Sequence, residues 1–147
     1  MENRLKAIAV LLRASKSVEK VLKTDIDSYG LNTSEFGVLE FLFHKGPQPM
    51  NNLCSKLLMA NSSMTYVVDN LIKRNYVIKY IDEADKRSNY VMLTKEGEEF
   101  INSIFPAHEK SIEEIFSVLS DSELMGLVES LKKIGYHTEK INKIRRE

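Results

Sequence analysis

The sequence predicts a mainly α-helical protein with one small β-hairpin, an α+β fold. Apolar residues recur every three or four positions over most of the 147 residues, which is the pattern of amphipathic helices. Two short runs, residues 76–81 and 89–94, are instead rich in β-branched and aromatic residues and flank a polar turn. The chain is 43% apolar and 29% charged, an ordinary globular composition, so we expect one domain over residues 1–147.

Two helices are predicted in the first third of the chain. Residues 3–27 carry apolar residues on one face and Lys and Glu on the other, and Gly30 suits the left-handed turn that follows a helix. A second helix is predicted at 33–45, because Asn32 is a good N-cap and Glu35 lies three residues later. A Gly-Pro pair ends it.

Two more helices are predicted before the hairpin. A short one starts at Pro49 and runs through Leu53, Leu57 and Leu58. The next lies within 59–75, where small polar residues are expected to cap it: Asn61, Ser62 and Ser63. Its inward face is expected to consist of Met64, Val67, Val68 and Leu71.

The chain is predicted to return to helix after the hairpin. This helix starts at Thr94, and Pro106 is expected to kink or interrupt it. Ser120 offers an N-cap for a last helix, with Glu123 three residues later. Apolar residues recur in this last helix with a spacing near seven residues.

Charge is unevenly distributed, although the 21 Lys and Arg residues balance the 21 Asp and Glu residues. Residues 45–95 carry a net charge of +4, and residues 96–129 carry −8. A basic segment attracts a polyanion even within a neutral chain, because the local field steers association. Random placement of the charges is the alternative explanation.

The sequence offers little for catalysis, cofactors or membranes. The three histidines form no paired-ligand motif, the six glycines do not cluster into a phosphate-binding loop, and the single cysteine excludes an intrachain disulfide. We therefore expect no enzyme activity, no cofactor and no metal. No apolar run approaches the ~20 residues that cross a bilayer, and the first residues are amphipathic. We expect a cytoplasmic protein that does not bind membranes.

The order of these elements indicates a winged helix-turn-helix. A helix with small polar residues at its start fits the DNA major groove, where such side chains reach base edges. A thin basic hairpin, the wing, places a guanidinium in the narrow and negative minor groove. A winged helix that binds proteins rather than DNA is the alternative.

Three segments resemble the MarR family of bacterial transcriptional regulators. Residues 31–39 (LNTSEFGVL) are similar to the opening of the second helix in that family, and residues 69–77 (DNLIKRNYV) are similar to the exit of its recognition helix. Residues 82–87 (DEADKR) and 91–97 (VMLTKEG) match the DxxDxR…LTxxG signature of the family wing. The resemblance implies a homodimeric repressor that binds a pseudo-palindromic operator in double-stranded DNA.

The resemblance also assigns roles along the chain. Residues 31–97 would form the DNA-binding lobe, and residues 1–30 and 98–147 a helical dimerisation region. The expected DNA contacts are Ser62, Ser63, Thr65, Tyr66, Asn70, Lys73, Lys86 and Arg87. The expected bracing residues of the wing are Asp69, Lys79, Asp82 and Asp85. The expected dimerisation residues are Leu5, Ile8, Leu12, Leu124, Leu127, Leu131, Ile134 and Ile141. Tyr66 departs from the arginine of many relatives, so base preference does not transfer.

Regulation is the least defined property. Family members often release DNA when a small aromatic or anionic effector binds, and the resemblance implies such an effector without identifying its residues. Others sense peroxide through a cysteine in the first helix, which has none here. Cys54 lies in the third helix and is expected to be a buried, inert thiol.

Overall fold

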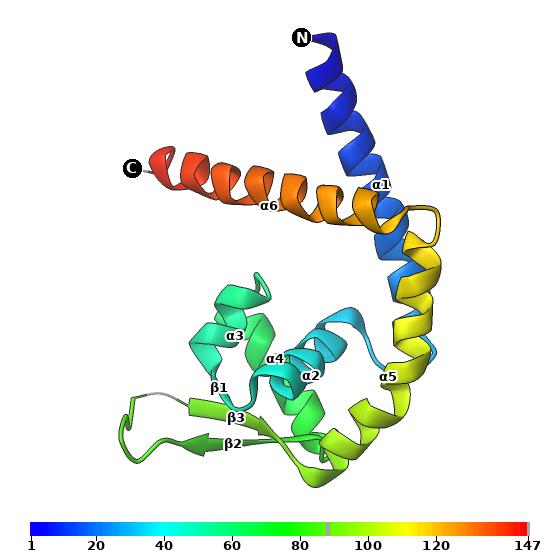
Figure 1. Ribbon diagram of the computed structural model, residues 1–147. Helices are drawn as coiled ribbons and strands as arrows, with labels where there is room; N and C mark the ends of the chain where they lie inside the picture. The colour runs from blue at the N-terminus through cyan, green and yellow to red at the C-terminus, as the bar shows by residue number, and fades with distance from the viewer. Residues whose placement is uncertain (88, 147) are drawn as a thin grey trace. The chain divides into compact units, whose positions relative to one another are not determined.

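A computed structural model describes residues 1–87 and 89–146 of the chain (Figure 1). The elements in chain order are α1 (Glu2–Asp27), α2 (Thr33–Lys45), β1 (Gln48–Pro49), α3 (Met50–Lys56), α4 (Asn61–Lys73), β2 (Val77–Ile81), β3 (Asn89–Leu93), α5 (Lys95–Phe116) and α6 (Asp121–Ile144). They form two units, Met1–Ser111 and Ile112–Glu147. The predicted fold class is confirmed, and the division of the chain into a DNA-binding lobe and a dimerisation region stays a prediction.

Local signals set the ends of several helices. At α2, the Asn32 side chain accepts a hydrogen bond from the Glu35 backbone N–H, and Glu35 accepts one from the Asn32 N–H in return. The same reciprocal capping box joins Ser120 and Glu123 at the start of α6. Gly30 adopts a φ of +73°, as expected for the turn after α1. These three predictions are confirmed.

The sheet is larger than the hairpin that the sequence predicts. Its order is β1-β3-β2, and both pairs are antiparallel, with Lys79 opposite Val91 and Gln48 also opposite Val91. The extra strand β1 has two residues, too few to show an alternating pattern. Pro49 is tolerated there because β1 lies at an edge, where a missing N–H breaks no inner ladder.

Two helix expectations are wrong. The N-cap of α4 is Ala60 without a side-chain hydrogen bond, so the small polar residues belong to the first turn itself. The third helix stops at Lys56, and Leu58 takes a left-handed φ of +53° in the turn to α4. Pro106 lies inside α5 and does not interrupt it, because the helix buries Ile101, Ile104 and His108 around it and this packing outweighs the lost hydrogen bond. The kink expected at Pro106 stays a prediction.

The core of the first unit lies among α2, α3, α4, α5 and the sheet (Figure 1). The side chains with least exposure come from all of these elements: Val38, Leu39, Leu53, Met64, Val68, Leu71, Val77, Val91 and Ile101. Burying one such side chain contributes about 1.5–3 kcal/mol, so the core fixes α4 firmly against the rest of the first unit. Among residues 1–87 and 89–146, no helix combines the length and apolarity needed to span a membrane.

Candidate nucleic-acid interface

Helix α4 divides sharply into a packed face and an open face. Met64, Val67, Val68 and Leu71 are buried, as the spacing predicts. The side chains on the open face that sequence reasoning assigned to DNA are exposed: Ser62, Ser63, Thr65, Tyr66 and Lys73. Tyr66 is 69% exposed, which is high for an aromatic side chain, whereas Asn70 is half-buried. The open face is therefore a rigid display of small polar groups beside one aromatic ring.

The wing presents an exposed guanidinium at its tip. The Arg87 side chain is 97% exposed, and its Nε lies 3.9 Å from Asp85 Oδ1. The same Asp85 oxygen accepts a hydrogen bond from the Arg87 backbone N–H at 3.1 Å. Asp82 accepts a backbone hydrogen bond from Ala84 at 3.1 Å and so folds the start of the turn. The two acids thus shape the loop that carries Arg87 and the exposed Lys86.

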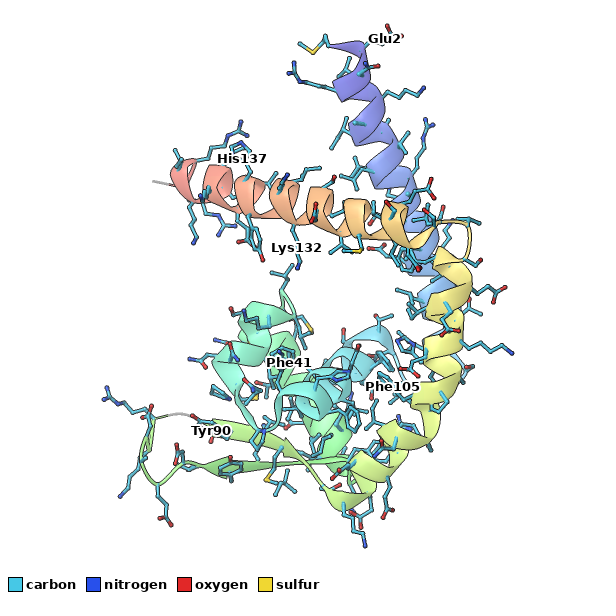
Figure 2. The ribbon with its side chains drawn as sticks, viewed as in Figure 1. Glu2, Phe41, Tyr90, Phe105, Lys132 and His137 are labelled. Atoms are coloured by element: carbon cyan, nitrogen blue, oxygen red, sulfur yellow. The ribbon has the colours of Figure 1, made fainter. Side chains whose placement is uncertain are left out.

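The body of the wing is stiffened on both faces. Tyr80 and Tyr90 stack across β2 and β3 with ring centroids 5.5 Å apart, and Figure 2 shows Tyr90 on the wing. Lys79 Nζ donates to Asp69 Oδ1 at 2.9 Å and joins β2 to α4. Half of the Asp69 side chain is exposed, so this ion pair contributes geometry more than stability.

The LTxxG segment fixes the exit of α4. Thr94 Oγ1 donates to the Asn75 carbonyl at 2.6 Å and accepts from the Gly97 N–H at 3.0 Å, so one hydroxyl caps α5 and holds the end of α4. Asn75 has a φ of +62°, a conformation that asparagine tolerates. A Cβ on Gly97 would lie 2.0 Å from the Tyr76 carbonyl oxygen, so this position requires glycine.

Arg74 is a structural contact that sequence reasoning missed. Its Nη1 donates to the Gly30 carbonyl at 2.8 Å and lies 3.9 Å from Glu35 Oε2. Its guanidinium carbon lies 5.0 Å from the centroid of the Tyr76 ring. Arg74 thereby attaches the C-terminal end of α4 to the turn between α1 and α2. The place of Arg74 directly after α4 is the signal that the sequence offers. It does not reveal the partner, because Gly30 is 44 residues away in sequence.

Comparisons with known proteins agree with this architecture. The family model described as "Transcriptional regulator SarA/Rot" matches residues 20–104, more than half of the chain. The HTH-type transcriptional regulator MhqR of Bacillus subtilis is 38% identical over 141 residues, which cover 96% of this chain and 97% of that protein. The crystal structure of AbsC, a MarR family regulator from Streptomyces coelicolor, superposes with a TM-score of 0.87 over 95% of this chain and 97% of AbsC, at 22% identity. The chain belongs to the MarR family.

Membership in the MarR family makes this chain a transcriptional regulator rather than an enzyme. A second structure with the same fold is that of Sco3205 from Streptomyces coelicolor in complex with DNA. It superposes with a TM-score of 0.84 at 20% identity and covers 92% of this chain and 87% of Sco3205.

A buried polar cluster joins α1 to α5 in this MarR protein, and sequence reasoning missed it. Asp25 Oδ2 lies 2.7 Å from His108 Nδ1, while Asp25 Oδ1 accepts hydrogen bonds from Tyr29 Oη at 2.6 Å and Ser111 Oγ at 2.8 Å. The His108 ring packs on Phe36 with centroids 4.5 Å apart. No local pattern predicts the cluster, because Asp25 and His108 are 83 residues apart.

The cluster changes the titration of two of its members. Burial raises the pKa of Asp25, but the hydrogen bonds from Tyr29, His108 and Ser111 together outweigh it, so its pKa lies below the ordinary value of 3.8. Burial, together with the hydrogen bond and negative charge of Asp25, raises the pKa of Tyr29 to about 12. Across the neutral pH range, Asp25 is therefore an ionised acceptor and Tyr29 is a protonated donor.

The residues assigned to dimerisation lie on two helices with little burial. On α1, Leu5, Ile8 and Leu12 are half or more exposed. On α6, whose residues are all described, none is buried: Leu131 and Ile134 are exposed, while Leu124, Leu127 and Ile141 are half-buried.

Cys54 is buried, as expected, and its thiol donates to Asn61 Oδ1 at 3.1 Å.

Proposed function

We propose that this MarR-family regulator is a cytoplasmic, sequence-specific DNA-binding repressor. The observation that carries the proposal is the pairing of the open polar face of α4 with the exposed Arg87 of the wing. α4 enters the major groove, where Ser62, Ser63 and Tyr66 read base edges. Arg87 enters the adjacent minor groove, whose negative potential favours a guanidinium.

The repressor acts as a homodimer on a pseudo-palindromic operator. Support comes from the exposed apolar side chains of α1, because a stripe with Leu5 at 62% and Leu12 at 56% exposure is costly to leave in water. The last helix adds a similar stripe around Leu131 and Ile134. Two protomers bring two α4 helices to two half-sites, which doubles the contacts on one duplex.

A small aromatic or anionic effector lowers the DNA affinity of the dimer by favouring a conformation that does not fit the operator. The support for an effector is the resemblance to the MarR family, whose members often release DNA when a small molecule binds. No residue of this chain is assigned to the effector.

The DNA that flanks the gene is first searched for inverted repeats. The test is then a binding titration of the protein on a duplex that contains such a repeat. We expect saturable binding of two protomers per repeat, at nanomolar concentrations and with strong salt dependence. Equal affinity for the repeat and for a scrambled duplex would contradict sequence-specific repression. Sedimentation that shows a monomer at micromolar concentration would contradict the homodimer.

A further inference from the structure

A hollow of about 370 Å³ lies between α3, α4 and the wing. Apart from one methionine, its described lining consists of six polar side chains: Asn51, Asn61, Thr65, Lys79, Arg87 and Asn89. None of these six is acidic, and five of them carry N–H donors. Its two cations are partly neutralised, Lys79 by Asp69 at 2.9 Å and Arg87 by Asp85 at 3.9 Å. The hollow therefore suits an anion chiefly through its neutral N–H donors.

One face of α4 is turned toward this hollow. Asn61 and Thr65 are one helical turn apart and both line it. Asp69 continues the same face by another turn and receives the hydrogen bond of Lys79 from β2. The face therefore looks at the wing, whereas the base-reading side chains at positions 62, 63 and 66 lie on the neighbouring part of the helix surface.

The amide of Asn61 is held in a defined orientation. The buried thiol of Cys54 donates to Asn61 Oδ1 at 3.1 Å, so the acceptor end of the amide points at α3. Among the described residues, the other end, Nδ2 with its two N–H groups, has no hydrogen-bond partner and is left for a ligand in the hollow. Lys79 differs, because part of its charge is already neutralised by Asp69.

The sugar–phosphate strand of DNA forms the wall between a major and a minor groove. A protein with α4 in one groove and the wing in the next must straddle that strand, and the hollow lies between these two elements. We propose that the hollow receives one backbone phosphate in each half-site, and that Asn51, Asn61 and Asn89 donate hydrogen bonds to it. This inference rests on the proposed DNA binding.

Neutral donors have a distinct signature in binding data. A lysine or arginine at a phosphate releases counterions, so its removal lowers the slope of log K against log salt concentration by about one. An amide adds a hydrogen bond without counterion release. A phosphate contact also carries no sequence information, so its loss weakens binding to every duplex alike.

The experiment measures duplex affinity of the full chain for Asn51→Ala, Asn61→Ala and Asn89→Ala. The matched control is Asn102→Ala, an exposed asparagine on α5. Two duplexes are used: one selected by the wild-type protein from a random library, and a scrambled duplex of the same length. We expect each of the three variants to bind both duplexes about threefold to tenfold more weakly, with an unchanged salt slope. The control should bind like the wild type.

A methylphosphonate scan then locates the phosphate. Replacing single phosphates of the selected duplex should reveal one position per half-site where the wild type loses affinity and Asn89→Ala loses no more. The inference is overturned by a loss confined to the selected duplex, by a salt slope reduced by about one, or by the absence of any such coupled position. A wild-type protein that selects no duplex refutes the proposed function itself.

Discussion

Asp25 is the residue whose substitution we expect to disturb the first unit most specifically. Its side chain is 9% exposed, as is that of His108, and its two oxygens make three polar contacts. Asparagine keeps an acceptor oxygen for Tyr29 and Ser111 but loses the charge and the oxygen that faces His108. Hydrogen bonds to a buried charged group contribute about 1.5–3 kcal/mol each, so Asp25→Asn should lower the free energy of unfolding by about 2–3 kcal/mol.

The pH dependence of this loss follows from the direction of the pKa shifts. Because the pKa of Asp25 is lowered on folding, its contribution is present above about pH 4 and is lost as the pH falls through the folded value. The difference between wild type and Asp25→Asn should therefore shrink in acid. The pKa of Tyr29 is raised to about 12, so its contribution is present below pH 10 and is lost between pH 10 and 12.

Urea denaturation at fixed protein concentration, from pH 3 to pH 8 for Asp25 and from pH 8 to pH 12 for Tyr29, measures both effects. The matched control is Asp27→Asn on the same helix, because Asp27 is exposed and pairs with Lys23 at the surface. That variant should lose less than about 0.5 kcal/mol. Equal stability of Asp25→Asn and wild type at pH 7, or a difference that does not shrink in acid, would refute the reasoning.

Four further predictions concern the wing, the α5 junction, the dimer and the thiol. Arg87→Ala should weaken operator binding by about 1–3 kcal/mol at matched salt and change unfolding by less than about 0.5 kcal/mol, and wild-type affinity in an intact dimer would make the wing a structural flap. Gly97→Ala should lower the free energy of unfolding by about 2 kcal/mol or more, and the thermal midpoint with it, because its Cβ would lie 2.0 Å from a backbone oxygen; an unchanged midpoint would contradict this. Leu127→Glu with Leu131→Glu should yield monomers in sedimentation, because unpaired charges in a buried seam cost several kcal/mol, and an unaltered dimer would exclude this interface. Cys54→Ser should leave DNA binding and its response to oxidants unchanged, since serine also donates to an amide oxygen; if the variant lost a peroxide-induced release of DNA, Cys54 would be the sensor.

The parts of the fold that the sequence predicts are those with local causes. The capping box of Asn32 and Glu35 satisfies backbone groups within four residues, so it is visible in the sequence and correct in the structure. The packed face of α4 follows from helical spacing for the same reason. Strand β1 was missed because its two residues pair with β3 more than 40 residues later. The caps expected on α4 failed because small polar residues suit both a cap and an exposed first turn.

The residues of the candidate interface also divide into those that the sequence predicts and those that only the structure shows. Exposure of Ser62, Ser63 and Tyr66 follows from the periodicity of one helix. The contacts that hold this helix in place depend on chain segments that meet only after folding, as Arg74 meets Gly30. Sequence patterns therefore identify the groups that face outward, while the tertiary structure supplies the residues that orient them.

The two contacts missed from the sequence lie close together on the chain and hold the same turn. Asp25 fixes the last part of α1 to α5, and five residues later the Gly30 carbonyl accepts the hydrogen bond of Arg74 at the end of α4. Gly30 has a φ of +73°, so the turn between them adopts a backbone that few other residues would support. A displacement of the end of α1 relative to α5 breaks the contact between Asp25 and His108, and it acts on the end of α4 through the hydrogen bond between Gly30 and Arg74. This is the physical requirement for a change at the N-terminal helix to alter the presentation of α4.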